Sequence, residues 1–223
     1  MRSSSTTTDG WWRGLPGVGF AEAHLLAALD HAAASGALSG SVLIGYDGRA
    51  GARELAHLAA DLLTTHGLSC VLTTGAAPTP AIGRLVWQHS HLNAAIIVTA
   101  SHNPPGFLGV KLRDGQGQGI PWPAPSDDQR APIATLPAAP QPHPSLDVLP
   151  AYATTIGQTL TATAHRFDGH LVIDAAHGAL GALATHLPEL HEGRPDQVGQ
   201  VPMSVGDLLP VRVELEQIAP RTD

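Results

Sequence analysis

Residues 94–111 read Ala94-Ala-Ile-Ile-Val-Thr-Ala-Ser-His-Asn-Pro-Pro-Gly-Phe-Leu-Gly-Val-Lys111, and the rest of the chain is organised around this stretch. Its first five residues are apolar, which is typical of a strand buried on both faces of a sheet. Asn103-Pro-Pro-Gly106 can continue neither a strand nor a helix, because prolines lack amide donors and glycine favours a turn. We therefore expect Ser101 and His102 on an exposed loop at the carboxyl end of a strand, where α/β sheets bind ligands.

The segments that precede this stretch alternate between apolar runs and amphipathic helices. From hydrophobic spacing and glycine stops we expect helices at 21–34, 52–66 and 79–91, and strands at 41–45 and 69–73. Thr79 is expected to cap the third helix, with Pro80 in its first turn. This order predicts the α/β class, with a layered, largely parallel sheet that carries helices on both faces.

Composition and charge exclude several classes of protein. The chain of 223 residues has a formal net charge of −7, whereas a protein that binds nucleic-acid backbone needs a basic face. No apolar run approaches the length of a membrane span. The single cysteine, Cys70, rules out an internal disulfide, and a buried strand residue is its expected role. We expect a cytoplasmic protein that binds neither nucleic acid nor membrane, and we leave its oligomeric state open.

Proline divides the chain into three parts. Residues 121–150 contain nine of the 19 prolines, so this segment is expected to be an extended linker. It separates a first α/β domain, residues 1–120, from residues 151–223, which we expect to form part of a second α/β domain. In that second part, we expect helices at 151–164 and 179–190 and a strand at 169–174. The glycines of 114–119 follow no apolar strand of their own, and a turn is expected there rather than a nucleotide-binding loop.

Residues 99–111 closely resemble the active-site serine loop of the α-D-phosphohexomutases, the phosphoglucomutase and phosphomannomutase family. Thr99-Ala-Ser-His-Asn-Pro104 and Lys111 match the family's pattern, while Leu108 stands where the family usually has asparagine. The resemblance implies that Ser101 is a phosphoserine that donates and recovers a phosphoryl group, with His102 and Lys111 assisting proton transfer. Transfer of a phosphoryl group depends on positioning and charge neutralisation more than on covalent chemistry by the protein. Without the full pattern, a Ser-His pair would indicate only a polar loop.

Three shorter segments also resemble the family's motifs. Thr8-Asp-Gly-Trp-Trp-Arg-Gly14 resembles its opening motif with one extra residue, and Gly45-Tyr-Asp-Gly-Arg49 resembles a motif at the end of a strand. Residues 174–179 resemble the start of its second domain, where His177 is expected to shape a turn. The resemblance implies that the residues contacting substrate or phosphate are Arg13, Arg49 and Asn103. From the residues alone, Asp47 and Arg49 would pair with each other or with backbone amides.

The family's loop for Mg²⁺, Asp-Gly-Asp-x-Asp-Arg, does not occur in this sequence. The phosphate on Ser101 is the one metal ligand that the resemblance implies here, although Mg²⁺ needs about six oxygen ligands. We expect a truncated or incomplete member that converts hexose 1-phosphate to hexose 6-phosphate, with Mg²⁺ and a hexose 1,6-bisphosphate activator. One alternative is a non-catalytic, degenerate homologue that binds a phosphosugar or a partner. An unrelated phosphate-binding α/β module is another.

Overall fold

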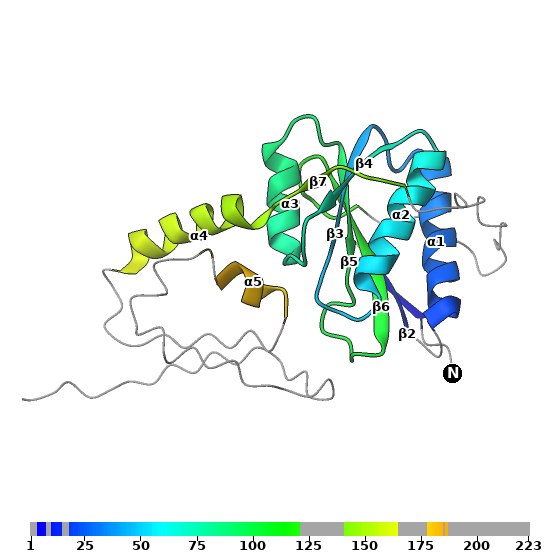
Figure 1. The fold of residues 1–223 in the computed structure, drawn as a ribbon, viewed down its shortest axis with the longest axis horizontal. Helices are drawn as coiled ribbons and strands as arrows, with labels where there is room; N and C mark the ends of the chain where they lie inside the picture. The colour runs from blue at the N-terminus through cyan, green and yellow to red at the C-terminus, as the bar shows by residue number, and fades with distance from the viewer. Residues whose placement is uncertain are drawn as a thin grey trace, which may run out of the picture.

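The apolar run that precedes Ser101 forms the central strand of a mixed sheet, β5 (Ala94–Val98), and all five of its residues are buried. The structure is a computed structural model that describes residues 4–7, 10–14, 18–120, 141–164, 178–184 and 186. Within these ranges, helices cover both faces of the sheet (Figure 1). The predicted α/β class, with helices on both faces, is therefore confirmed for the first part of the chain.

Seven described strands form the sheet in the order β1-β2-β6-β5-β3-β4-β7. The strands other than β5 are β1 (Ser4–Thr7), β2 (Gly10–Gly14), β3 (Ser41–Tyr46), β4 (Ser69–Thr73), β6 (Phe107–Asp114) and β7 (Ser145–Leu146). Pairing is parallel from β5 through β3 and β4 to β7, and antiparallel from β5 through β6 and β2 to β1. The expectation of a largely parallel sheet is correct for one half only.

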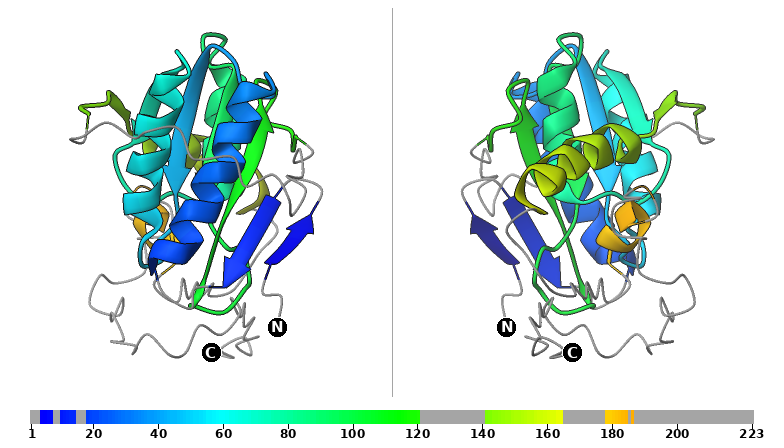
Figure 2. Two further views of the ribbon diagram at one scale, coloured as in Figure 1. Left: turned by 90° about the vertical axis from the view of Figure 1, so that its right-hand side faces the viewer. Right: turned by 90° about the vertical axis from the view of Figure 1, so that its left-hand side faces the viewer.

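The antiparallel half follows from the short connection after β5. A parallel partner would require a crossover of a dozen or more residues, whereas only the serine loop separates β5 from β6. Leu108, Val110 and Leu112 of β6 are buried on one face of the sheet, which gives this strand the alternation of a regular pleat. β1 and β2 continue the sheet outward from β6 (Figure 2).

Two helices cover one face and three lie on the other side. α1 (Val18–Ala34) and α2 (Ala52–Thr65) pack with Val42 and Ile44, whereas α3 (Thr79–Gln88) packs with Leu43. α4 (Leu149–Ala164) contacts α3, and α5 (Leu180–Ala184) contacts α4 (Figure 2). No helix in the described ranges is long and apolar enough to cross a membrane.

The expected element boundaries are close to the observed ones, with two corrections. Pro78 rather than Thr79 occupies the cap position of α3, because Pro78 is extended and Thr79 is already the first helical residue. α4 begins inside the predicted linker, at Leu149, where the Asp147 carboxylate accepts a hydrogen bond from the Leu149 amide. The expected strand at 169–174, His177 and most of the expected helix at 179–190 lie outside the described residues.

The edge segment, residues 141–146, lies at the β4 edge of the sheet. Its Ser145 and Leu146 form β7 beside β4. The His143 Nε2 atom lies 2.7 Å from Asp61 Oδ1 of α2, and the Gln141 amide donates to the same oxygen over 3.2 Å. The side chains of His143 and Asp61 are only 6% and 8% exposed. The last residues of the predicted linker therefore pack against α2 and β4.

Candidate active site

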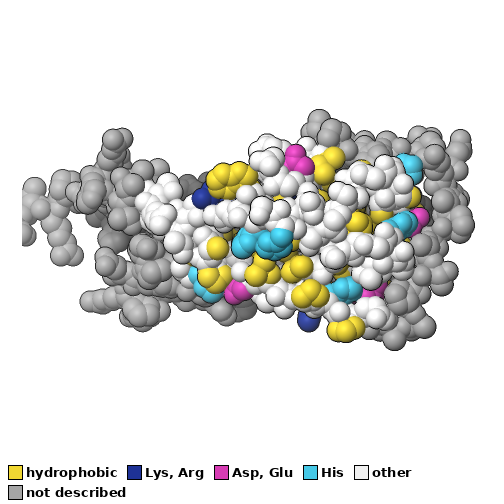
Figure 3. All heavy atoms as spheres, turned by 90° about the horizontal axis from the view of Figure 1, so that it is seen from above, with side chains coloured by type: hydrophobic (Ala, Val, Ile, Leu, Met, Phe, Trp, Pro, Cys, Tyr) yellow, Lys and Arg dark blue, Asp and Glu magenta, His cyan; other side chains and the backbone are white. Residues whose placement is uncertain are grey.

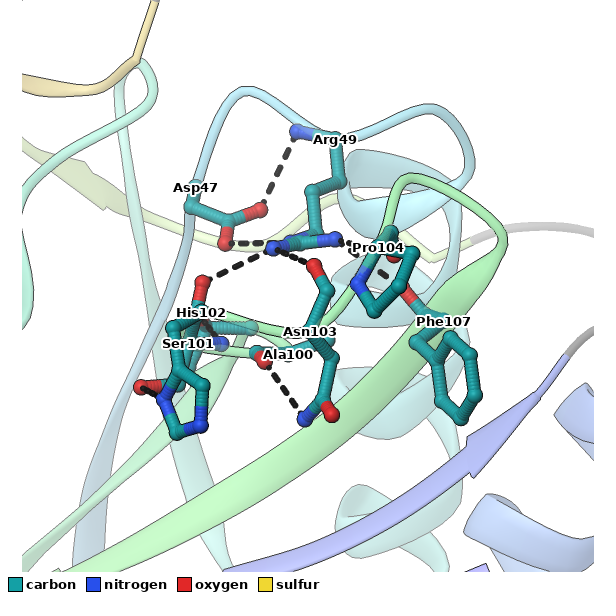
Figure 4. A network of polar contacts seen from close by, with 9 residues as sticks. Asp47, Arg49, Ala100, Ser101, His102, Asn103, Pro104 and Phe107 are labelled. Atoms are coloured by element: carbon teal, nitrogen blue, oxygen red, sulfur yellow. Dashed lines mark hydrogen bonds and ion pairs between the residues drawn. The ribbon is translucent and has the colours of Figure 1, made fainter. Parts of the chain in front are cut away.

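The loops that leave β3 and β5 lie side by side, because these strands are parallel neighbours whose carboxyl ends share one edge of the sheet. The Asp47 amide, directly after β3, donates to Val98 O at the end of β5 over 3.1 Å. The turn at 47–49 and the serine loop, residues 99–107, consequently form one network of polar contacts (Figure 4). The sequence-based expectation that Ser101 follows a strand is confirmed.

Ser101 has an unusual backbone conformation. Among the described residues it is the one non-glycine with a positive φ, at 55°. Its amide donates to Thr99 Oγ1 over 3.0 Å, and the Thr99 side chain is buried. Non-glycine residues in the left-handed region are often found at functional sites, where surrounding contacts hold them. The Ser101 and His102 side chains are both exposed, with 3.5 Å between Ser101 Oγ and His102 Nδ1.

Asn103 closes the loop from within. Its amide and its side-chain Nδ2 both donate to Ala100 O, over 3.0 and 2.9 Å. The Phe107 amide donates to Pro104 O and brings the chain into β6. The contacts give Asn103 a role in shaping the loop, and its predicted contact with substrate remains a prediction.

Arg49 reaches across from the neighbouring turn and contacts four carbonyl groups of the serine loop. Its Nη2 donates to Ser101 O and Asn103 O, each over 2.8 Å, and its Nη1 donates to Pro104 O over 3.0 Å and to Phe107 O over 3.4 Å. Its Nε lies 3.3 Å from Asp47 Oδ2. The predicted pairing of Asp47 with Arg49 is confirmed. Direct phosphate binding by Arg49 remains a prediction, and its observed partners belong to the loop.

Lys111 and Arg13 lie on the strands beyond the loop. Lys111 is partly buried in β6, where it is paired with Ile97 of β5 and Gly10 of β2. Arg13 lies in β2 opposite Leu108, so residues 10–14 of the segment that resembles the opening motif form a regular strand. Tryptophan favours a pleated strand, and two tryptophans precede Arg13 here. The structure thus brings Arg49 into contact with the Ser101 loop, and it places Lys111 and Arg13 in the sheet beside that loop.

Sequence reasoning missed Thr99 as a residue that shapes the site. Its hydroxyl accepts a hydrogen bond from the amide two residues later, a local pattern that threonine and serine often form in turns. That spacing, Thr-Ala-Ser, was the signal that could have identified it.

The opposite end of the sheet, where the parallel strands begin, has a different surface. Several histidines and scattered apolar side chains gather there (Figure 3). His89 and His91 pack edge to face with ring centroids 5.4 Å apart, and the guanidinium of Arg84 lies 5.3 Å from the ring of Trp87, which is 54% exposed. Across the described ranges, no group of three or more His, Cys, Asp or Glu side chains could hold a metal ion.

Comparison with known proteins places this site in a family. Residues 4–129, more than half of the chain, match the family model of phosphoglucomutase/phosphomannomutase, alpha/beta/alpha domain I. The chain belongs to this family. The serine loop, the turn at 47–49 and all described strands except β7 fall within the matched residues.

Relatives in the phosphoglucomutase/phosphomannomutase family match over the same part of the chain. A phosphoglucosamine mutase of Thiobacillus denitrificans is 34% identical over 158 residues, 68% of this chain and 33% of the relative. A phosphoglucosamine mutase of Synechococcus elongatus is 31% identical over 153 residues, 66% of this chain and 32% of the relative. The chain therefore spans about a third of the length of these curated relatives.

Solved structures support the fold. A crystal structure of a Thermus thermophilus protein, described as a phosphomannomutase, has a TM-score of 0.57 and 27% identity, and the match covers 76% of this chain and 39% of that protein. A family member from Burkholderia thailandensis has a TM-score of 0.54 and 24% identity, covering 82% of this chain and 41% of that one. At 24% identity, the match with the Burkholderia thailandensis protein supports the fold alone.

Mg²⁺, on which this family generally depends, has few ligands in the described residues. The ion prefers close to six oxygen ligands, commonly carboxylates together with phosphate oxygens. Beside Ser101 the one carboxylate in the network is that of Asp47, and it is already bonded to Arg49. The described residues therefore do not fit a complete Mg²⁺ site, and the function proposed below assigns no step to a metal ion.

Proposed function

We propose that this chain takes part in phosphoryl transfer of the phosphohexomutase type, between hexose 1-phosphate and hexose 6-phosphate, with Ser101 as the residue that carries the phosphoryl group. The observation that carries this proposal is the conformation of Ser101. It is exposed, has a positive φ, and lies on a loop at the carboxyl edge of the sheet that other residues hold in place. Family membership adds support, while the activity of the longer relatives comes to this chain only as part of the proposal.

In the proposed reaction the phosphoryl group moves between two oxygens. A hydroxyl of the bound sugar phosphate attacks the phosphorus of phosphoserine, the bond to Ser101 Oγ breaks, and a hexose 1,6-bisphosphate forms. Ser101 Oγ then attacks the other phosphate of the bisphosphate and regains a phosphoryl group, which leaves the isomeric monophosphate. The transition state gains most from alignment and charge neutralisation, so a rigid loop is worth more here than a strong nucleophile.

The neighbours of Ser101 have proposed roles in proton transfer and substrate binding. His102 Nδ1 lies 3.5 Å from Ser101 Oγ, and His102 is proposed to exchange a proton with the sugar hydroxyl. Lys111 is proposed to act on the same proton, and Arg13 and Asn103 are proposed to contact the substrate, whereas the guanidinium contacts of Arg49 go to Asp47 and the serine loop. The substrate class is a hexose phosphate, with a hexose 1,6-bisphosphate as activator. The phosphate on Ser101 is the one ligand proposed here for Mg²⁺, and the described residues do not complete a metal site.

The first experiment asks whether Ser101 accepts a phosphoryl group. The chain is incubated with glucose 1,6-bisphosphate and Mg²⁺, and intact and peptide masses are recorded for the natural sequence, Ser101→Ala and the control Ser90→Ala. Ser90 lies in the turn after α3, at the other end of the sheet. We expect one phosphoryl group on Ser101 in the natural chain and in Ser90→Ala, and none in Ser101→Ala.

Two outcomes would contradict the proposal. One is a natural chain that takes up no phosphate, and the other is phosphate on a different residue of Ser101→Ala. A coupled assay for conversion of glucose 1-phosphate to glucose 6-phosphate then separates complete turnover from phosphorylation alone. Ser101→Ala should keep its unfolding temperature, because the side chain lies on an exposed loop and fills no part of the core.

A further inference from the structure

The guanidinium of Arg49 forms hydrogen bonds with the serine loop and with Asp47. A guanidinium has five N–H groups, and the five contacts described above go to Asp47 and to the carbonyls of Ser101, Asn103, Pro104 and Phe107. Each N–H group therefore already has an acceptor. The guanidinium of Arg49 therefore uses its hydrogen bonds to hold the loop that carries Ser101 (Figure 4).

These contacts fix a conformation that the loop would otherwise leave. Four carbonyl oxygens that converge on one point repel one another unless a cation lies between them. A non-glycine residue with a positive φ persists only when its surroundings hold it there. Ser101 shows both features, since its own carbonyl is one of the four and its φ is 55°.

Asp47 fixes the guanidinium in turn. Its carboxylate accepts from the Arg49 amide over 3.0 Å and from Arg49 Nε over 3.3 Å, and its own amide is bonded to Val98 at the end of β5. The side chains of Arg49 and Asp47 are 11% and 20% exposed, so water screens this ion pair only in part. The turn thus connects the loop to the strand from which the loop starts.

We propose that Arg49, oriented by Asp47, is a positioning residue that holds Ser101 in the geometry needed for phosphoryl transfer. This inference rests on the function proposed above for Ser101. It gives Arg49 a task different from a direct contact with the phosphate of the substrate. The two tasks differ in their kinetic effect, because positioning changes the maximal rate and phosphate binding changes the concentration for half saturation.

The test replaces Arg49 by lysine in the full chain. Arg49→Lys keeps the charge but loses the planar fork that reaches several carbonyls at once. The control is Arg53→Lys, on the exposed side of α2 only four residues away. The rate of phosphoserine formation is measured against the concentration of glucose 1,6-bisphosphate. For Arg49→Lys we expect the maximal rate to fall by roughly tenfold to a hundredfold, with the half-saturating concentration unchanged.

A second readout does not depend on activity. The amides of Asn103 and Phe107 donate to Ala100 and Pro104 inside the loop, so their hydrogen exchange reports whether the loop is held. Their exchange should accelerate in Arg49→Lys and in Asp47→Asn, and should stay unchanged in Arg53→Lys. The second loop variant matters because it tests the same contact if Arg49→Lys fails to fold.

The outcomes separate this inference from the proposed function. Unchanged exchange in both loop variants would overturn the positioning role. A raised half-saturating concentration with an unchanged maximal rate would also overturn it, in favour of phosphate binding by Arg49. If the natural chain takes up no phosphate, the proposed function fails, and the exchange measurement alone decides whether Arg49 holds the loop.

Discussion

Two segments of this protein, the serine loop and the edge segment, are each held by an aspartate that contacts an arginine or a histidine. The two segments differ in which groups these side chains bind. At the serine loop, Asp47 orients Arg49, whose guanidinium binds four backbone carbonyls. At the edge segment, Asp61 contacts His143 directly and accepts from one backbone amide. The first arrangement presents an exposed serine, whereas the second pair is 6% and 8% exposed and presents no reactive group.

The difference shows why similar contacts can have different purposes. Around the serine loop the carbonyls that Arg49 binds belong to exposed or half-buried residues, so water can replace a broken contact there and little stability is lost. What is lost there is the conformation of Ser101. At the edge segment the side chains of Asp61 and His143 are shielded, so breaking their contact leaves a buried polar atom without that partner. We therefore expect loop variants to change activity and edge variants to change stability.

The largest expected effect on stability comes from Asp61→Ala. This change removes the acceptor for His143 and for the Gln141 amide and leaves both without that partner. We expect the free energy of unfolding to fall by about 1–3 kcal/mol, measured by urea denaturation. The rate of phosphoserine formation should stay the same.

A matched control is present in the same helix layer. Asp30 and His66 join α1 to the end of α2 with the same 2.7 Å separation, but their side chains are more exposed, at 16% and 24%. Asp30→Ala should therefore cost less than about 1 kcal/mol. Equal losses for the two variants would show that burial does not distinguish these pairs, and would remove the basis for the comparison.

The next effect in size concerns Thr99→Val, which keeps the shape of the side chain and removes the oxygen that accepts from the Ser101 amide. We expect a loss of stability of only about 1 kcal/mol, with phosphoserine formation slowed severalfold because Ser101 can leave its positive φ. Parallel measurements of urea unfolding and phosphorylation rate test both parts. If the variant loses stability but is phosphorylated at the natural rate, Thr99 contributes to stability, like the residues of the edge segment, and not to activity.

The sequence predicted the parallel half of the fold better than the antiparallel half. Strands β3, β4 and β5 and their helices follow from apolar runs and helical spacing, which are local signals. β6 was not predicted, because the prolines before it and the glycine within it obscure its alternating pattern. The buried residues of that pattern are Leu108, Val110 and Leu112. β7 has two residues in a proline-rich segment, and only its pairing with β4 defines it. Such pairing depends on distant residues and leaves no pattern in the segment itself.

The site was predicted by motif more than by geometry. The position of Ser101 after a buried strand follows from the sequence, because the apolar run and the following prolines mark where the strand ends. The contacts of Arg49 could not be predicted, since they require the parallel pairing of β3 with β5 that brings 47–49 beside the loop. Thr99 has a local signal, the spacing to Ser101, that was not used.

The smallest expected effect concerns Cys70 of β4, which is buried and close enough to Asp61 to be affected by its charge. Burial raises the pKa of the Cys70 thiol from its ordinary 9.0 to about 11, opposed by a hydrogen bond with Thr64 and supported by the negative charge of Asp61. Because the folded pKa lies above the unfolded one, this proton stabilises the folded protein below pH 9, and the contribution is lost as the pH rises towards 11. We expect iodoacetamide to modify Cys70 slowly at pH 8 and faster in Asp61→Ala, since a thiolate is the reacting species. Rapid alkylation of the natural chain at pH 8 would show that Cys70 is not protected from solvent, and burial would then no longer distinguish the surroundings of Asp61 from the serine loop.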